Sequence, residues 1–175
     1  MIHRARTLIA GCGNVLRGDD GFGVEVVRRL EESGGVPGAE LLDVGTGGIR
    51  LAQHLLGGYD RLIVVDAMVR GGLPGDLYVL SIDDVEIPAA VDLHQAIPSS
   101  ALALARQLHA LPAELFLIGC EPLEVDELTL ELSPAVAPQV EPAMDHARRL
   151  AALGCAAPGS SSVPPAAGRS REDAR

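Results

Sequence analysis

The chain has 175 residues, of which 47% are hydrophobic and 2% aromatic, and its formal net charge is −10. This length suits one domain with a core that needs no disulfide or structural metal, and the aliphatic composition favours an α/β domain over an aromatic-rich β-sandwich. The acidic charge argues against nucleic-acid and anionic-membrane partners, and the lack of an apolar run of roughly 18 residues or a signal-peptide pattern predicts a soluble cytoplasmic protein.

The first half of the chain alternates strand and helix patterns. The apolar run Thr7–Gly11 is bounded by glycine, as buried parallel strands are, and a turn-rich segment follows it to Gly21. Further along, the pattern predicts a helix from Gly23 to about Ser33, a strand at Ala39–Val44, a helix at Ile49–Leu56 and a strand at Arg61–Asp66.

The second half is less regular. It predicts an edge strand at Asp76–Ser81, a helix capped by Ser99 or Ser100 that ends near His109, and a last strand at Glu114–Gly119. Ser133 is expected to be the N-cap of a final helix that runs to about Leu153, with Pro134 in its first position and with Pro138 and Pro142 bending or delaying its first turns.

These elements predict one α/β domain over residues 1–155, built as a doubly wound, mostly parallel five-stranded sheet with helices on both faces. The strand at Thr7–Gly11 is expected in the centre, between the strands at Ala39–Val44 and Arg61–Asp66. Residues 156–175 are rich in Pro, Gly, Ser and charge without periodicity, and we predict a disordered tail there.

Carboxylates follow the first and third strands. Asp19 and Asp20 lie in the loop after the first strand, and Asp66 closes the third. In a doubly wound sheet, ligands collect beyond the carboxyl ends of the strands where the winding reverses, which is between these two strands. Asp also caps helices and loops, so a structural role stays open for one of the first pair and for Asp66.

A divalent metal fits these residues better than a nucleotide does. Gly11 and Gly13 suggest a dinucleotide-binding G-x-G-x-x-G motif, but Leu16 replaces its third glycine and the acidic pair would repel a phosphate. His94 is the loop histidine best placed to reach the strand ends, although such a residue is often only solvated. One imidazole and two carboxylates, from Asp20 and Asp66, suit a first-row divalent metal and leave positions open for water or substrate.

The residues around this site resemble those of the hydrogenase maturation proteases. Gly11–Gly23 is similar to the family's signature G-x-G-N-x-L-x-x-D-D/E-x-x-G, and Asp43–Gly48 resembles its glycine-rich loop after the second strand. The likeness covers about residues 7–153 and continues, in order and with comparable spacing, at Val64–Ala67, His94–Gln95, Gly119–Pro122 and Leu132–Pro134.

The resemblance implies a cytoplasmic endopeptidase that removes the C-terminal extension of a nickel-loaded nickel–iron hydrogenase large-subunit precursor. The family's metal-contacting positions fall on Asp20, Asp66 and His94, which are therefore the implied catalytic and metal-binding residues. Nickel is expected to come with the precursor, and other divalent metals could occupy the same site. The precursor is the only implied partner, with no nucleic acid and no membrane.

The mechanism stays open at this stage. Either a carboxylate activates water as a general base or the metal polarises the scissile carbonyl. The cysteines form no C-x-x-C pair and are expected to be reduced thiols, and a Cys12–His94 nucleophile is the weaker alternative. A non-catalytic checkpoint that binds the nickel site of the same precursor without cutting it would use the same three residues.

Overall fold

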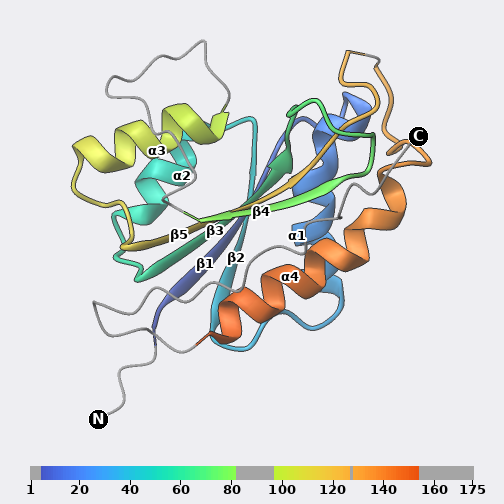
Figure 1. Cartoon of the computed structure of the whole chain (residues 1–175). Helices are drawn as coiled ribbons and strands as arrows, with labels where there is room; N and C mark the ends of the chain where they lie inside the picture. Colours follow the sequence, from blue (N-terminus) through green and yellow to red (C-terminus); the bar gives the residue numbers. More distant parts are fainter. Residues whose placement is uncertain (1–4, 82–96, 127, 154–175) are drawn as a thin grey trace, which may run out of the picture.

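The computed structural model describes residues 5–81, 97–126 and 128–153 (Figure 1). Its strands form one sheet in the order β2-β1-β3-β5-β4. These strands are β1 (Thr7–Cys12), β2 (Ala39–Gly45), β3 (Arg61–Ala67), β4 (Leu77–Ser81) and β5 (Glu114–Cys120). Only the β4–β5 pair is antiparallel, with β4 at the edge. The predicted sheet is confirmed, including the central position of β1 between β2 and β3.

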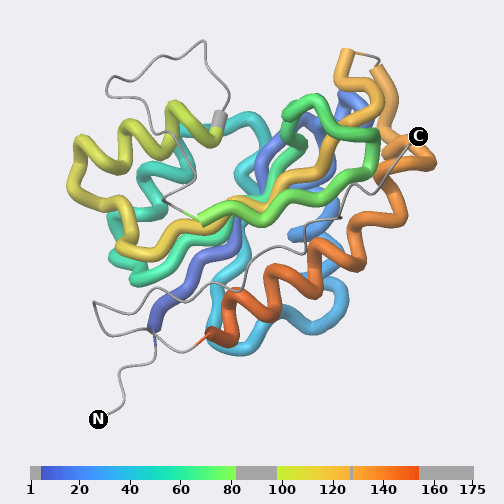
Figure 2. Tube along the Cα trace, viewed as in Figure 1, coloured from blue at the N-terminus to red at the C-terminus, as the bar shows by residue number. Residues whose placement is uncertain are grey.

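Helices cover both faces of the sheet, as predicted. They are α1 (Phe22–Glu32), α2 (Gly48–Leu55), α3 (Ile97–Gln107) and α4 (Val140–Ala152). Figure 2 shows α1 and α4 on one face and α2 and α3 on the other. Leu8 and Val64 pack toward α2 and α3, whereas Ile9 and Val65 pack toward α1 and α4. Both sides of each central strand are therefore apolar, which explains the continuous aliphatic runs in the sequence.

The predicted start of α3 is wrong. The helix begins at Ile97, so Ser99 and Ser100 lie inside its first turns and neither is its N-cap. The helix ends at Gln107, close to the predicted end near His109. His109 itself has a positive φ of 54°, which is incompatible with a right-handed helix. The sequence pattern therefore located this helix but placed its start too late.

The predicted start of α4 is also wrong. The carbonyl oxygen of Ser133 accepts hydrogen bonds from the amides of Val136 and Ala137, which form a turn, and a 3-10 turn follows at Ala137–Gln139. The α-helix begins only at Val140, after Pro138, so the expected delay is confirmed, and Pro142 lies inside its first turn. The predicted boundary between domain and tail, at residues 155 and 156, lies outside the described residues.

Within the described ranges, no helix is long and apolar enough to cross a membrane.

A buried arginine joins the start of β3 to the end of α4. Arg61 is 1% exposed, and its Nε donates to Oε2 of Glu114 at 2.7 Å. Its Nη1 donates to the carbonyl oxygens of Leu150 and Leu153, each at 2.9 Å. Carbonyls at a helix C-terminus have few partners within the helix, and Arg61 supplies donors to two of those at the end of α4.

We expect Arg61→Met to lower the free energy of unfolding by about 3 kcal/mol, because it leaves a partly buried carboxylate and the end of α4 without their donor. The matched control is Arg28→Met, which removes an arginine that is paired with Glu25 and Glu32 on the exposed surface of α1. Its cost should be below about 1 kcal/mol. Equal costs in urea titrations of both variants would show that Arg61 does not anchor α4.

Candidate functional site

Glycines bring the turn after β1 against the ends of two strands. A Cβ atom on Gly13 would lie 1.7 Å from the carbonyl oxygen of Asp20, and one on Gly23 would lie 2.1 Å from the carbonyl oxygen of Val65. Gly13 also has a φ of +121°, which L side chains rarely adopt. Side chains at these positions would push the turn away from the sheet, so the glycines of the sequence motif are required by packing.

Asp19 is an internal anchor for the connection between β5 and α4. Its side chain is 1% exposed, and Oδ2 accepts from the amide of Leu123 at 2.8 Å and from that of Glu124 at 3.4 Å. Oδ1 accepts from the amide of Ser133 at 2.7 Å. The possibility that Asp19 or Asp20 caps α1 is not borne out, because the N-cap of this helix is Gly21 and has no side-chain cap. Asp19 instead fixes distant backbone.

Asp20 and Asp66 are the two carboxylates that the structure brings together. Oδ2 of Asp20 accepts from the amide of Asn14 at 2.9 Å, and Oδ1 of Asp66 accepts from the amide of Ala67 at 2.9 Å. Within the described part of the chain, neither carboxylate has an ion-pair partner. Both carboxylates are partly buried, and each accepts one hydrogen bond from a backbone amide. Neither has a cation among the described residues to balance its charge.

The electrostatics of Asp66 reflect this arrangement. Burial, followed by the nearby charge of Asp20, raises its pKa from 3.8 to about 8, and the hydrogen bond from the amide of Ala67 opposes both effects only in part. A cation between the two carboxylates would lower the pKa of Asp66, because a positive charge favours the ionised form of both groups. The pair is therefore suited to receive a positive charge.

A complete metal site cannot be built from the described residues alone. They contain no group of three or more His, Cys, Asp or Glu side chains that could hold a metal ion. Asp20 and Asp66 could supply two oxygen ligands, and the predicted third ligand, His94, lies outside the described residues.

The thiol alternative loses support. Cys12 is fully buried, and burial, followed by the charges of Asp66 and Asp43, raises the pKa of its thiol well above the ordinary value. Burial likewise raises the pKa of Cys120 to about 12, with Asp19 contributing. Both thiols stay protonated at neutral pH, and a thiol needs its thiolate form to act as a nucleophile.

Sequence reasoning missed a second carboxylate anchor, Glu121. It follows β5 directly and accepts hydrogen bonds from the amides of Arg70 and Gly71, at 2.8 and 3.2 Å, and from the hydroxyl of Tyr78 at 2.8 Å. Burial opposes ionisation of Glu121, but the Tyr78 hydroxyl and the backbone amides outweigh it and lower its pKa. Glu121 thereby holds the loop that follows Asp66. The sequence signal that could have predicted this anchor is the position of Glu121 at the end of a buried strand, as for Asp66.

Comparisons with known proteins agree on one family. The family model described as hydrogenase maturation protease matches residues 24–149. The chain is 40% identical over 150 residues to the hydrogenase expression/formation protein HupD of Rhodobacter capsulatus, covering 82% of this chain and 70% of that protein. It is 35% identical over 154 residues to the hydrogenase 2 maturation protease of Escherichia coli, covering 85% of this chain and 90% of that protein.

Solved structures show the same fold. The hydrogenase maturating endopeptidase HybD from E. coli superposes with a TM-score of 0.68 at 30% identity, over 81% of this chain and 89% of that one. The nickel–iron hydrogenase maturation protease HybD from Thermococcus kodakarensis superposes with a TM-score of 0.67 at 32% identity, over 83% of this chain and 99% of that one.

The two adjacent aspartates should respond differently to the same isosteric change. Asp19→Asn should lower the free energy of unfolding by about 2–3 kcal/mol, because the amide group cannot accept every hydrogen bond that the carboxylate receives. Asp20→Asn keeps an oxygen for the amide of Asn14 and should cost less than about 1 kcal/mol. Chemical denaturation of both variants measures this difference, and equal losses would contradict the division of roles.

Asp66 should make stability depend on pH. Because its pKa is raised from 3.8 to about 8 in the folded state, the unfolded chain loses this proton first, and the contribution of Asp66 becomes less favourable as pH rises through that window. Asp66→Asn should therefore match the wild type near about pH 4 and exceed its free energy of unfolding by about 1–2 kcal/mol near about pH 9.

Metal-free protein and denaturant titrations at both pH values provide the measurement. The control is Asp145→Asn, which removes a 62% exposed carboxylate from the surface of α4 and should not produce the gain in stability near about pH 9. A constant difference for Asp66→Asn would mean that Asp66 is ionised normally in the folded protein.

Proposed function

The chain belongs to the hydrogenase maturation protease family, and we propose that it is the cytoplasmic endopeptidase that trims the C-terminal extension of a nickel-loaded nickel–iron hydrogenase large-subunit precursor. Family membership supports the peptidase activity and the precursor as partner. The observation that carries the nickel-dependent part is the uncompensated pair of Asp20 and Asp66 at the carboxyl ends of β1 and β3.

In this proposal the nickel arrives as part of the substrate, held by cysteine thiolates of the precursor. Asp20 and Asp66 supply oxygen ligands from the enzyme, and His94 is the proposed third ligand. Free enzyme at neutral pH holds a proton on Asp66, since the pKa of this group is about 8. Approach of the positive ion favours the ionised carboxylate, so engagement of the loaded precursor would release that proton.

The carboxylate that has lost its proton is a candidate general base. Asp66 would take a proton from the water that attacks the scissile carbonyl and pass it to the departing amine, while Asp20 stays bound to the ion. Polarisation of the carbonyl by the ion itself is the alternative, and it needs no base on the enzyme.

A weak resident site would make nickel a recognition signal. Two carboxylates and one imidazole form a modest ligand set, and Asp20 lies in a turn, so the enzyme alone should hold nickel loosely and lose it on dialysis. Tight engagement would need ligands from both proteins. The enzyme would thereby reject precursor that has not received its metal.

The decisive comparison uses the same precursor purified with and without nickel. Wild-type enzyme should release the C-terminal peptide, detected by mass spectrometry, only from the loaded precursor. Asp20→Asn, Asp66→Asn and His94→Ala should each slow this release by at least about 100-fold, because each removes a ligand or the base. Cleavage of nickel-free precursor at a comparable rate would overturn the recognition role of nickel.

The same experiment separates the enzyme from its main alternative. A non-catalytic checkpoint would bind the loaded precursor through the same three residues but leave its mass unchanged. Intact precursor that co-purifies with wild-type protein and not with Asp20→Asn would therefore favour the checkpoint.

A further inference from the structure

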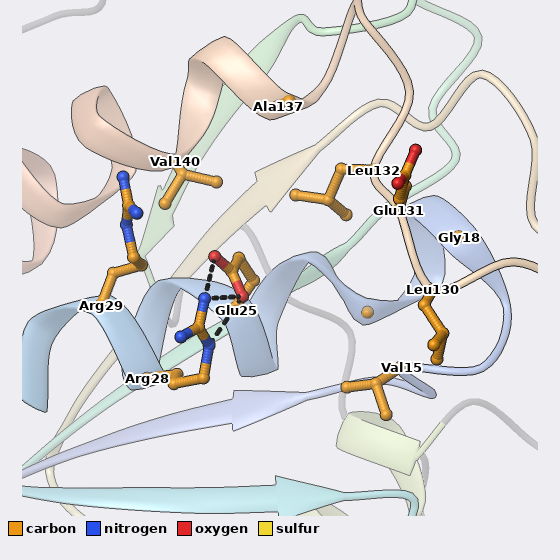
Figure 3. A pocket seen from close by; sticks show the side chains of 11 residues that line it. Val15, Gly18, Glu25, Arg28, Arg29, Leu130, Glu131, Leu132, Ala137 and Val140 are labelled. Atoms are coloured by element: carbon orange, nitrogen blue, oxygen red, sulfur yellow. Dashed lines mark hydrogen bonds and ion pairs between the residues drawn. The ribbon is translucent and has the colours of Figure 1, made fainter. Parts of the chain in front are cut away.

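An open pocket of about 580 Å³ lies beside the turn that carries Asp20. Its apolar walls come from Val15 in this turn, from Leu130 and Leu132 in the β5–α4 connection, and from Val140 at the start of α4. In Figure 3, Leu132 and Val140 point toward each other across one end of the pocket, and Val15 and Leu130 lie at the other. We call this space the docking pocket.

The docking pocket shares its backbone with the candidate site. Gly18 and Gly21, which bound the 3-10 turn around Asp20, both line it. The amide of Gly18 donates to the carbonyl oxygen of Thr129 at 2.8 Å, and the amide of Thr129 donates to the carbonyl oxygen of Leu16 at 3.1 Å. The wall formed by the β5–α4 connection is therefore tied to the Asp20 turn, and an occupant of the pocket would lie beside this turn.

The charges that line the docking pocket cancel. Its lining holds two arginines, Arg28 and Arg29, and an equal number of carboxylates, Glu25 and Glu131. Arg28 donates from Nη2 to Glu25 at 2.6 Å, as the dashed lines in Figure 3 show, and Arg29 lies 3.9 Å from a carboxylate oxygen of Glu141, which is outside the lining. Both arginines are therefore paired and neither is free for a phosphate or an acidic segment, so the pocket suits an uncharged apolar ligand.

Exposed apolar side chains extend this surface. Val15 is 45% exposed and Leu130 75%, although both are large enough to gain from burial. Next to them along the chain, Leu16 is 56% exposed and Leu128 is 85% exposed. The bridge through Thr129 places these two chain segments side by side. Several exposed apolar side chains on two adjoining segments are typical of a binding site.

We infer that the docking pocket holds an uncharged apolar stretch of the precursor close to the bond that is cut, and so positions that bond at Asp20 and Asp66. This inference rests on the proposed function. The occupant is argued from the equal numbers of opposite charges in the lining and from the turn shared with Asp20, because a ligand held there lies beside the turn that carries one of the two carboxylates. A second copy of the chain in the same place would cover the Asp20 turn.

The test measures cleavage rates over a range of concentrations of nickel-loaded precursor. Leu130→Asp and Val15→Asp should raise KM by about tenfold, more than they lower kcat, because each puts a charge on a wall that desolvates on binding. Leu130→Met should keep the wild-type KM. The matched control, Leu56→Asp, changes a side chain that is 58% exposed at the far end of α2 and should leave both constants unchanged.

Sedimentation of enzyme with loaded precursor provides a readout that does not depend on cleavage. The wild type could bind the precursor without cutting it, with Leu130→Asp weakening this binding about tenfold. That result would support the docking pocket and contradict the proposed activity. Equal precursor binding by wild type, Leu130→Asp and Val15→Asp would overturn the docking pocket, as would the absence of any binding. Self-association of the enzyme that Leu130→Asp abolishes would also overturn it, by showing that a second copy is the occupant.

Discussion

The close approach of one turn to the ends of two strands determines the rest of this structure. Gly13 and Gly23 allow backbone atoms of the turn and of α1 to touch the ends of β1 and β3 where no Cβ would fit. The contact brings the carboxylate of Asp20 near that of Asp66 in a partly buried place, where the described residues supply no counter-charge. Burial and like charge then raise the pKa of Asp66 to about 8. The chemistry proposed for the site follows from this packing.

Adjacent residues in this turn have opposite roles. Asp19 has its charge satisfied by backbone amides from the β5–α4 connection, so it stabilises the fold and holds one wall of the docking pocket. Asp20 keeps its charge available next to Asp66. Because both residues lie in the same 3-10 turn, the pocket that would hold the precursor and the carboxylates that would meet its nickel are parts of one unit.

The sequence predicted those features that depend on local pattern and on the general rules for parallel sheets. Aliphatic runs located the strands, and the carboxyl-end rule placed Asp20 and Asp66 together. The partners of Asp19 were not predictable, since they lie more than 100 residues further along the chain. The late start of α4 was expected from its prolines, but the turn that Ser133 forms in place of an N-cap was not. The position of His94 relative to the two carboxylates remains a prediction.

The ionisation of Asp66 tests the central claim most directly. Side-chain carboxyl ¹³C chemical shifts of the metal-free enzyme, followed from about pH 3 to pH 10, give this pKa without reference to stability or activity. The account predicts a midpoint near 8 in the wild type and a lower one in Asp20→Asn, where the neighbouring charge is gone. An ordinary midpoint near 4 that does not change in Asp20→Asn would show that the two carboxylates do not form an uncompensated pair.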